Sequence, residues 1–292
     1  MLERRGKVIE QRVYSVDTED AEADRLRTLA NRIASDLKKG RVKIRPLPRV
    51  AVELGKLAAS TDPDLGAAIA LVQRDANLAG AVLRGASSAS LAGKPPTNVA
   101  EAAMKLGVAG MRDMAFAASM AGVFRCGGLD ASVKAQITHG FTVGVLTSEL
   151  CKMMKIDNSV GFLAGLFHDV GTLLVISALC TYGRETQDAA TVRRISERIH
   201  TRVGQFILKQ WDMDPNIVAA ARHHDDDDAE GLAVVVQMAD YIDHIGGSTA
   251  EERVARLVAE PCPYGPPLSA AHLQYLAATA EAAHNDPFIT SL

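Results

Sequence analysis

A continuous apolar run, 161–176, places a histidine and an aspartate side by side in its middle, His168 and Asp169. A stretch of this composition is expected in a protein core, where an imidazole and a carboxylate cost free energy unless each has a partner. A divalent metal is one such partner, because both side chains are good metal ligands. A His–Asp hydrogen bond inside a helical core is the other, and for an isolated pair it is the better interpretation. The rest of the chain decides between them.

The composition favours a helical protein. Hydrophobic residues make up 48% of the 292 residues and aromatic residues only 4%, which suits closely packed helices better than sheets. The net charge of −3 gives no indication of a general affinity for nucleic acid or for an anionic membrane. We expect no apolar segment of the roughly 18 uninterrupted residues that a membrane span needs, and the polar N-terminus leads into no signal-peptide core. A cytoplasmic protein without membrane insertion is therefore expected.

The cysteines are scattered along the chain. No CxxC spacing occurs, so the pattern of neither a zinc knuckle nor a disulfide framework is present. We therefore predict reduced thiols at all four positions, Cys126, Cys151, Cys180 and Cys262.

The apolar periodicity predicts helices along the whole chain, and we expect an all-α fold. A helix over about 19–39 carries apolar side chains at three- and four-residue intervals. Two prolines in 44–48 then predict an extended connector, because proline disfavours helix at the residue before it. Gly107 is expected to separate two later helices. Residues 7–16, with weak alternation, are the one candidate strand.

The His–Asp pair belongs to an ordered series of side chains that can bind metal. In chain order the series is His139, His168 with Asp169, His200, His223 with His224, and finally Asp240. Its members lie in or next to apolar helical patterns, and the helices of a bundle can bring such side chains to one point. A series of this kind favours a metal as the partner of His168 and Asp169 over a hydrogen bond between the two alone.

The series and several other segments carry a family resemblance. The order H…HD…D is that of the HD superfamily of helical metal-dependent phosphohydrolases, and the fuller series H…HD…H…HH…D resembles its HD-GYP branch. Segments 47–52, 75–79 with 83–89, 98–107 and 204–224 are similar to the HDOD family. This second resemblance covers most of the chain, and it implies an all-helical, two-lobed bacterial module with a signalling or regulatory role.

The resemblance also implies a division of the chain into three parts. These are an N-terminal extension with one helix (1–40), an HDOD domain (41–246) with an N-terminal lobe (41–125) and an HD-like lobe (126–246), and a C-terminal helical tail (247–292). The expected partner is a protein of a signalling pathway, with a nucleotide as a further candidate ligand.

By the same resemblance, the histidine series would form two metal sites. The first would use His139, His168, Asp169 and Asp240, and the second His200, His223 and His224 with Asp169 as a bridge. The implied cofactor is a divalent metal, up to a dinuclear pair, with iron or manganese favoured over zinc and no organic group. A bridging carboxylate has two oxygens for such a pair, which activates water for attack on phosphorus.

Three departures from the catalytic HD-GYP pattern argue against hydrolysis of cyclic di-GMP. Thr172 stands where those enzymes have a lysine that can stabilise phosphate charge, and Ala135 replaces a metal-binding glutamate. A run of four aspartates, 225–228, follows the paired histidines in place of the segment that contacts a cyclic dinucleotide. This run reads as a solvated loop, and its charge would repel an anionic substrate.

Three functions are compatible with these observations. The first is a regulatory module with a retained metal site, acting through a partner or a nucleotide. The alternative is a dinuclear-metal phosphohydrolase acting on a nucleotide or phosphoester, and a weaker third is an inactive sensor of a cyclic dinucleotide. No catalytic residue is assigned, and the three histidines outside the series are expected to be ordinary surface residues: His244, His272 and His284.

Overall fold

Helices make up the secondary structure of the described chain. The computed structural model describes residues 22–87, 94–124, 129–183 and 188–291, and these contain α-helices and no strand. The predicted all-α class is confirmed. The candidate strand at 7–16 lies outside the described residues.

The first helix covers residues 22–38, close to the range predicted for it. The helices that follow are α2 (Arg49–Ala58), α3 (Leu65–Gln73), α4 (Ala76–Gly85), α5 (Val99–Val123), α6 (Asp130–Met154), α7 (Gly161–Phe167), α8 (Val170–Tyr182), α9 (Ala189–Gln210), α10 (Pro215–His223), α11 (Leu232–His244), α12 (Ala250–Ala259), α13 (Ala270–His284) and α14 (Pro287–Thr290). Inside α5, Gly107 has a φ of 65° and separates two helical segments, as the sequence predicted.

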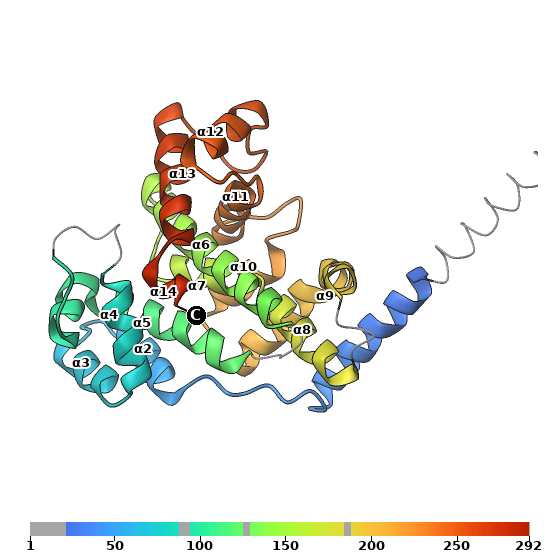
Figure 1. Cartoon of the computed structure of the whole chain (residues 1–292), viewed down its shortest axis with the longest axis horizontal. Coiled ribbons are helices and arrows are strands. Elements are labelled where there is room, and N and C mark those ends of the chain that lie inside the picture. Colours follow the sequence, from blue (N-terminus) through green and yellow to red (C-terminus); the bar gives the residue numbers. More distant parts are fainter. Residues whose placement is uncertain (1–21, 88–93, 125–128, 184–187, 292) are drawn as a thin grey trace, which may run out of the picture.

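The helices form two groups joined by an aromatic contact. Helices α2 to α5 lie together at one side, and α6 to α11 form the larger group from which α12 and α13 extend (Figure 1). Phe167 of α7 meets Phe116 of α5 edge-on, with ring centroids 5.8 Å apart, and also contacts Trp211 at 6.1 Å. These rings bury apolar surface where the two groups meet. The predicted boundaries at 41, 126 and 247 remain predictions.

The helix over 22–38 packs on the larger group instead of on the α2–α5 group that follows it in the chain. Its Asp36 accepts a hydrogen bond from the Tyr182 hydroxyl of α8 at 2.8 Å, and its Glu22 forms an ion pair with Arg194 of α9. The extended connector predicted around 44–48 then crosses to α2 along one edge of the molecule (Figure 1).

One stretch, Gly161–Tyr182, is long and apolar enough by length and composition to cross a membrane. By length and composition, the expectation that no such segment exists is therefore wrong. The stretch is the α7–α8 pair, and 89% of its most apolar window is buried inside the protein. Neighbouring helices thus already cover its apolar surface.

The cysteine prediction holds in part. Cys151 and Cys262 are free thiols, and burial raises the pKa of Cys151 to about 11. Cys180, at the end of α8, is disulfide-bonded, so the prediction of a reduced thiol there is wrong. Cys126 lies outside the described residues. Sequence spacing could not reveal this bond, because disulfides depend on distance in the fold.

Candidate metal centre

Six side chains of the predicted series come from helices that converge in the larger group. They are His139 in α6, His168 at the end of α7, Asp169 at the start of α8, His200 in α9, His224 at the end of α10 and Asp240 in α11. Because His168 and Asp169 occupy the junction of two helices, they can serve two different groups of donors.

Backbone contact between helices brings these donors close together. A Cβ on Gly165 of α7 would lie 2.6 Å from the Cα of Gly144 in α6, and one on Gly171 of α8 would lie 2.0 Å from the carbonyl oxygen of His200. Only glycine permits such an approach. The α7–α8 segment is therefore held against α6 on one side and against α9 on the other.

The first donor group contains His139, His168 and Asp240. The two Nε2 atoms of His139 and His168 are 3.2 Å apart. Asp240 Oδ1 lies 3.1 Å from His139 Nε2, 3.5 Å from His168 Nε2 and 2.9 Å from His244 Nδ1, yet no contact of this buried oxygen in the described residues has the geometry of a hydrogen bond. Two nitrogens and an unsatisfied carboxylate oxygen thus point at one small space.

The hydrogen bonds of the two rings determine which nitrogens carry lone pairs. His168 Nδ1–H donates to the Gly165 carbonyl at 2.7 Å, and His139 Nδ1–H donates to Asp243 Oδ2 at 2.8 Å. In neutral rings both Nε2 atoms would then present lone pairs to each other. A positive charge must lie between them, either a proton or a metal cation. Donor types, burial and orientation all fit a metal.

The second donor group contains Asp169, His200 and His224. Asp169 Oδ1 is 3.2 Å from His200 Nε2 and 3.6 Å from His224 Nε2, and the two histidine nitrogens are 3.3 Å apart. His200 Nδ1–H donates to the Ser196 carbonyl, which leaves its Nε2 free to act as a ligand. This second group can hold a metal, and so can two sets that include His139: one with His168 and Asp169, the other with Asp240 and His244.

The surroundings of both groups favour positive charge. Burial opposes protonation of His139, but its contacts with Asp240 and Asp243 outweigh burial and raise its pKa to about 10. Burial likewise opposes protonation of His200, whose contact with Asp225 and whose attraction to Asp169 raise its pKa to about 9. A metal cation would therefore enter a site that already attracts positive charge.

A pH dependence of stability follows for protein stripped of metal. Histidine titrates near about 6.5 when unfolded, whereas His139 and His200 hold their protons to about 10 and about 9 in the fold. Their stabilising contribution is complete below pH 6.5 and is lost as the pH rises through these values.

We therefore expect the unfolding midpoint of protein kept in EDTA to fall between pH 7 and pH 10. Bound metal takes the place of the protons, so the unfolding midpoint of metal-loaded protein should fall less over the same interval. Denaturant titrations of both forms at several pH values measure the difference. Stripped protein that gains stability relative to loaded protein as the pH rises would contradict the expectation.

The model of the HDOD domain matches residues 44–227, which is more than half of the chain. The chain belongs to the HDOD family. No match was found among curated proteins.

Several solved structures share the fold at low sequence identity. A candidate metal-dependent phosphohydrolase from Shewanella amazonensis SB2B has a TM-score of 0.69 at 18% identity, over 89% of this chain and 99% of that one. An HDOD domain protein of unknown function from Geobacter sulfurreducens has a TM-score of 0.58 at 18% identity, over 87% of each chain. A candidate signal transduction protein from Marinobacter aquaeolei VT8 has a TM-score of 0.53 at 17% identity, over 86% of this chain and 59% of that one.

One member of the predicted series lies apart from both donor groups. The side chain of His223 is 49% exposed, and its Nδ1 contacts Asp226 Oδ2 at 2.6 Å. It is the last residue of α10, whereas His224 caps the helix and is buried. The structure thus directs only the second histidine of the pair toward Asp169.

Several acidic and histidine side chains that the sequence did not single out lie at the donor groups. Asp225, read from the sequence as part of a solvated loop, has Oδ2 3.1 Å from His200 Nε2. His244, expected at the surface, has Nδ1 2.9 Å from Asp240 Oδ1. The spacing of His244, one helical turn after Asp240, was the available signal for it. Asp225 gave no such signal.

The C-terminal tail reaches the first donor group through Asp243. This buried carboxylate holds His139 through one oxygen, and its other oxygen lies 2.8 Å from His284 Nε2 of α13. Arg253 of α12 approaches the same oxygen at 3.5 Å. Both tail residues lie outside the HDOD match. The tail therefore fixes the carboxylate that orients a candidate ligand.

Replacing Asp243 with Asn is expected to weaken metal binding about 10- to 100-fold, the usual effect of losing a carboxylate that orients a ligand histidine. Asp227→Asn, which changes an exposed residue of the acidic loop, serves as the matched control. Metal titration of both variants gives the ratio of dissociation constants. Equal constants would show that Asp243 does not orient His139 for metal.

Proposed function

We propose that this HDOD protein is a bacterial signalling module that retains a metal site and acts by binding a partner. The single observation that carries the proposal is the facing pair of ring nitrogens of His139 and His168, 3.2 Å apart beside an unsatisfied Asp240 oxygen. The proposed ligands are His139, His168 and Asp240 for one ion and His200 and His224 for a second, with Asp169 between them. Iron or manganese is proposed ahead of zinc.

The surroundings of the donor groups support a role other than hydrolysis of cyclic di-GMP. Thr172 is neutral and largely buried, so it offers no cation to a phosphate. Ala135, one turn before His139, is exposed and has no ligand atom. Asp225 adds a carboxylate beside His200, and its charge disfavours an anionic substrate there.

The alternative proposal is a dinuclear-metal phosphohydrolase acting on a nucleotide or phosphoester. The name given to the Shewanella protein and the two donor groups around Asp169 support it. A bound divalent metal would supply a Lewis acid that polarises a phosphoryl oxygen. Asp169 also accepts a hydrogen bond from Gln136 Nε2 at 3.1 Å through Oδ2, which fixes the carboxylate while Oδ1 faces His200.

One experiment separates the two proposals. The metal content of the purified protein is measured by elemental analysis, and hydrolysis of bis(p-nitrophenyl) phosphate is followed with the same sample. Metal without turnover supports the signalling module, whereas about two equivalents of iron or manganese with turnover support the enzyme. A protein that holds no metal, even after incubation with these ions, contradicts both proposals.

A further inference from the structure

We propose that a basic groove between the helix over 22–38 and α9 binds a nucleotide that carries two or more phosphate groups. The groove has a volume of about 810 Å³ and is lined by three elements: the C-terminal end of the first helix, the second half of α9, and Arg222 of α10. This volume lies within the range of about 300–1,000 Å³ typical of small-molecule sites. The proposal does not depend on metal binding.

The charge of the groove is the first observation. Its cationic side chains are Lys38, Lys39, Arg202, Lys209 and Arg222, and no carboxylate lines it. Only Arg222 has an ion-pair partner within the described residues, Asp226 at 3.8 Å. Five positive charges thus surround one cavity of a chain whose net charge is −3. Such a cavity concentrates anions.

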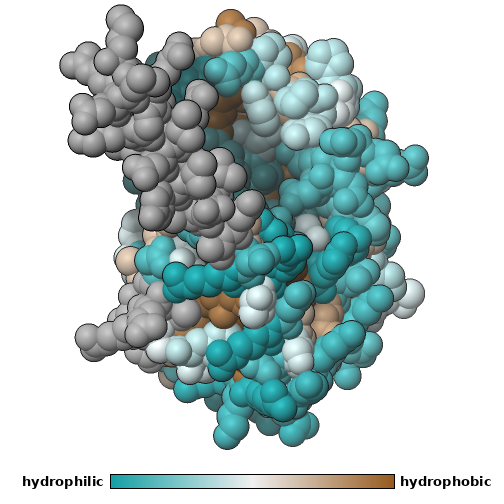
Figure 2. Space-filling view, turned by 90° about the vertical axis from the view of Figure 1, so that its right-hand side faces the viewer, coloured by the Kyte–Doolittle hydropathy of each residue, from teal (hydrophilic) through white to brown (hydrophobic). Residues whose placement is uncertain are grey.

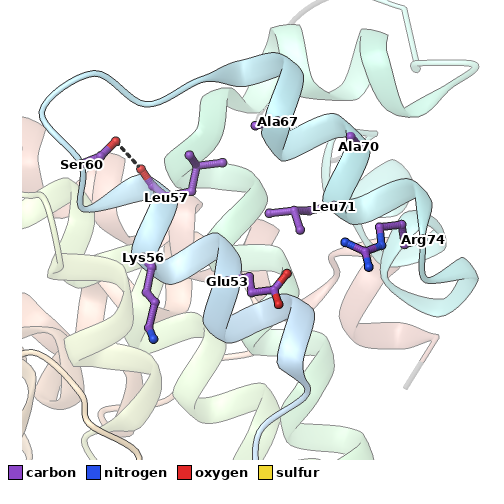
Figure 3. Close-up of a pocket in the computed structure, with 8 residues that line it drawn as sticks. All are labelled: Glu53, Lys56, Leu57, Ser60, Ala67, Ala70, Leu71 and Arg74. Carbon is purple, nitrogen blue, oxygen red and sulfur yellow. Dashed lines mark hydrogen bonds between the residues drawn. The ribbon is translucent and has the colours of Figure 1, made fainter.

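A second pocket of the protein shows the contrast. It lies between α2 and α3 and has a volume of about 560 Å³ (Figure 3). There Glu53 lies among the cations Lys56 and Arg74, so the charges partly balance, and the remaining lining is mostly apolar. The groove at α9 differs because positive charge alone surrounds it.

The apolar wall of the groove is the second observation. Leu37 and Val203 are buried, and Phe206 is half-buried and packs on the core while also lining the groove. An aromatic ring beside several cations suits a ligand with one flat apolar part and one polyanionic part. A nucleotide has both, whereas inorganic phosphate would leave the wall unused.

The attachment of the first helix gives the groove its shape. The hydrogen bond between Tyr182 and Asp36 and the ion pair between Arg194 and Glu22 hold this helix along α9. The helix precedes the HDOD match, so the groove exists only because this addition packs on the domain. The helix over 22–38 lies toward the right of Figure 1, the side that Figure 2 turns to the viewer, and hydrophilic side chains predominate on the described part of that face.

The test is isothermal titration of the full-length protein with ATP in EDTA, so that metal does not contribute. The charge-reversal variant Arg202→Glu with Lys209→Glu is compared with Arg193→Glu with Arg198→Glu, which makes the same charge change at exposed positions of the same helix outside the groove. We expect the groove variant to bind ATP at least about tenfold more weakly than the control variant, because it loses two charge-assisted contacts.

Two further ligands identify what the groove recognises. Tripolyphosphate should bind more weakly than ATP, and adenosine should not bind measurably, because both parts of the ligand are needed. Equal ATP affinity in the two variants, or binding of a poly-glutamate peptide but not of ATP, would overturn the proposal. If the double variant does not fold, Lys38→Glu with Lys39→Glu at the end of the first helix provides the same comparison.

Discussion

Protein with both His168 and Asp169 replaced by alanine is expected to hold no metal. Each of the two donor groups loses a member, because His168 belongs to the first and Asp169 is shared by both. The second group keeps only His200 and His224, and the first keeps three donors only if the exposed His244 joins His139 and Asp240, so neither retains a full set of buried ligands. Elemental analysis after incubation with manganese or iron measures the loss, from up to two equivalents to near zero.

The same double variant should also lose stability. His168 is 1% exposed, and its ring contacts those of His139 and His224, so alanine leaves a cavity among buried polar groups. Loss of bound metal lowers the free energy of unfolding by a further amount, about 2.7 kcal/mol when the free metal is at 100 times its dissociation constant. Thermal unfolding of both proteins in the presence of the metal gives the difference in Tm.

A matched control separates these effects from the loss of any histidine and aspartate. His272 and Asp24 are exposed, and His272→Ala with Asp24→Ala makes the same chemical change away from the donor groups. This control should keep its metal and its Tm. A His168→Ala with Asp169→Ala variant that behaves like the control would show that the proposed site is wrong.

Among the described glycines, Gly171 is where substitution by alanine is expected to reduce stability most. The new Cβ would lie 2.0 Å from the carbonyl oxygen of His200 and 2.9 Å from the backbone nitrogen of Gly204. Both neighbours are backbone atoms of α9, so no side chain can rotate away. The two helices must separate, and overpacking of this kind costs about 3 kcal/mol or more.

The separation should also weaken the second donor group. Asp169, at the start of α8, lies 3.2 Å from His200 of α9, and this distance depends on the backbone contact at Gly171. Metal content should therefore fall below that of the native protein. Denaturant unfolding and elemental analysis of one sample measure both effects.

Gly122→Ala is the control for this substitution. Gly122 lies in α5, and a Cβ there would have no atom within 4 Å. In a helix this change should be neutral or stabilising by up to about 1 kcal/mol. If Gly171→Ala is no less stable than Gly122→Ala, the close contact between α8 and α9 does not exist in solution.

The sequence by itself determined the helical class, the family and most of the candidate ligands. Apolar periodicity and the kink at Gly107 are local properties, because a helix forms from neighbouring residues. The order of histidines and aspartates along the chain carried the family resemblance, which the HDOD match over 44–227 confirms. No tertiary information was needed for these conclusions.

Only the tertiary structure decided which side chains meet. His223 and His224 are neighbours in sequence, but successive residues of a helix point about 100° apart, so one faces Asp226 at the surface and the other Asp169. Asp243 and His284 are separated by 41 residues, yet they lie 2.8 Å apart beside His139. Helix packing sets such contacts, and local sequence patterns do not record how one helix docks on another.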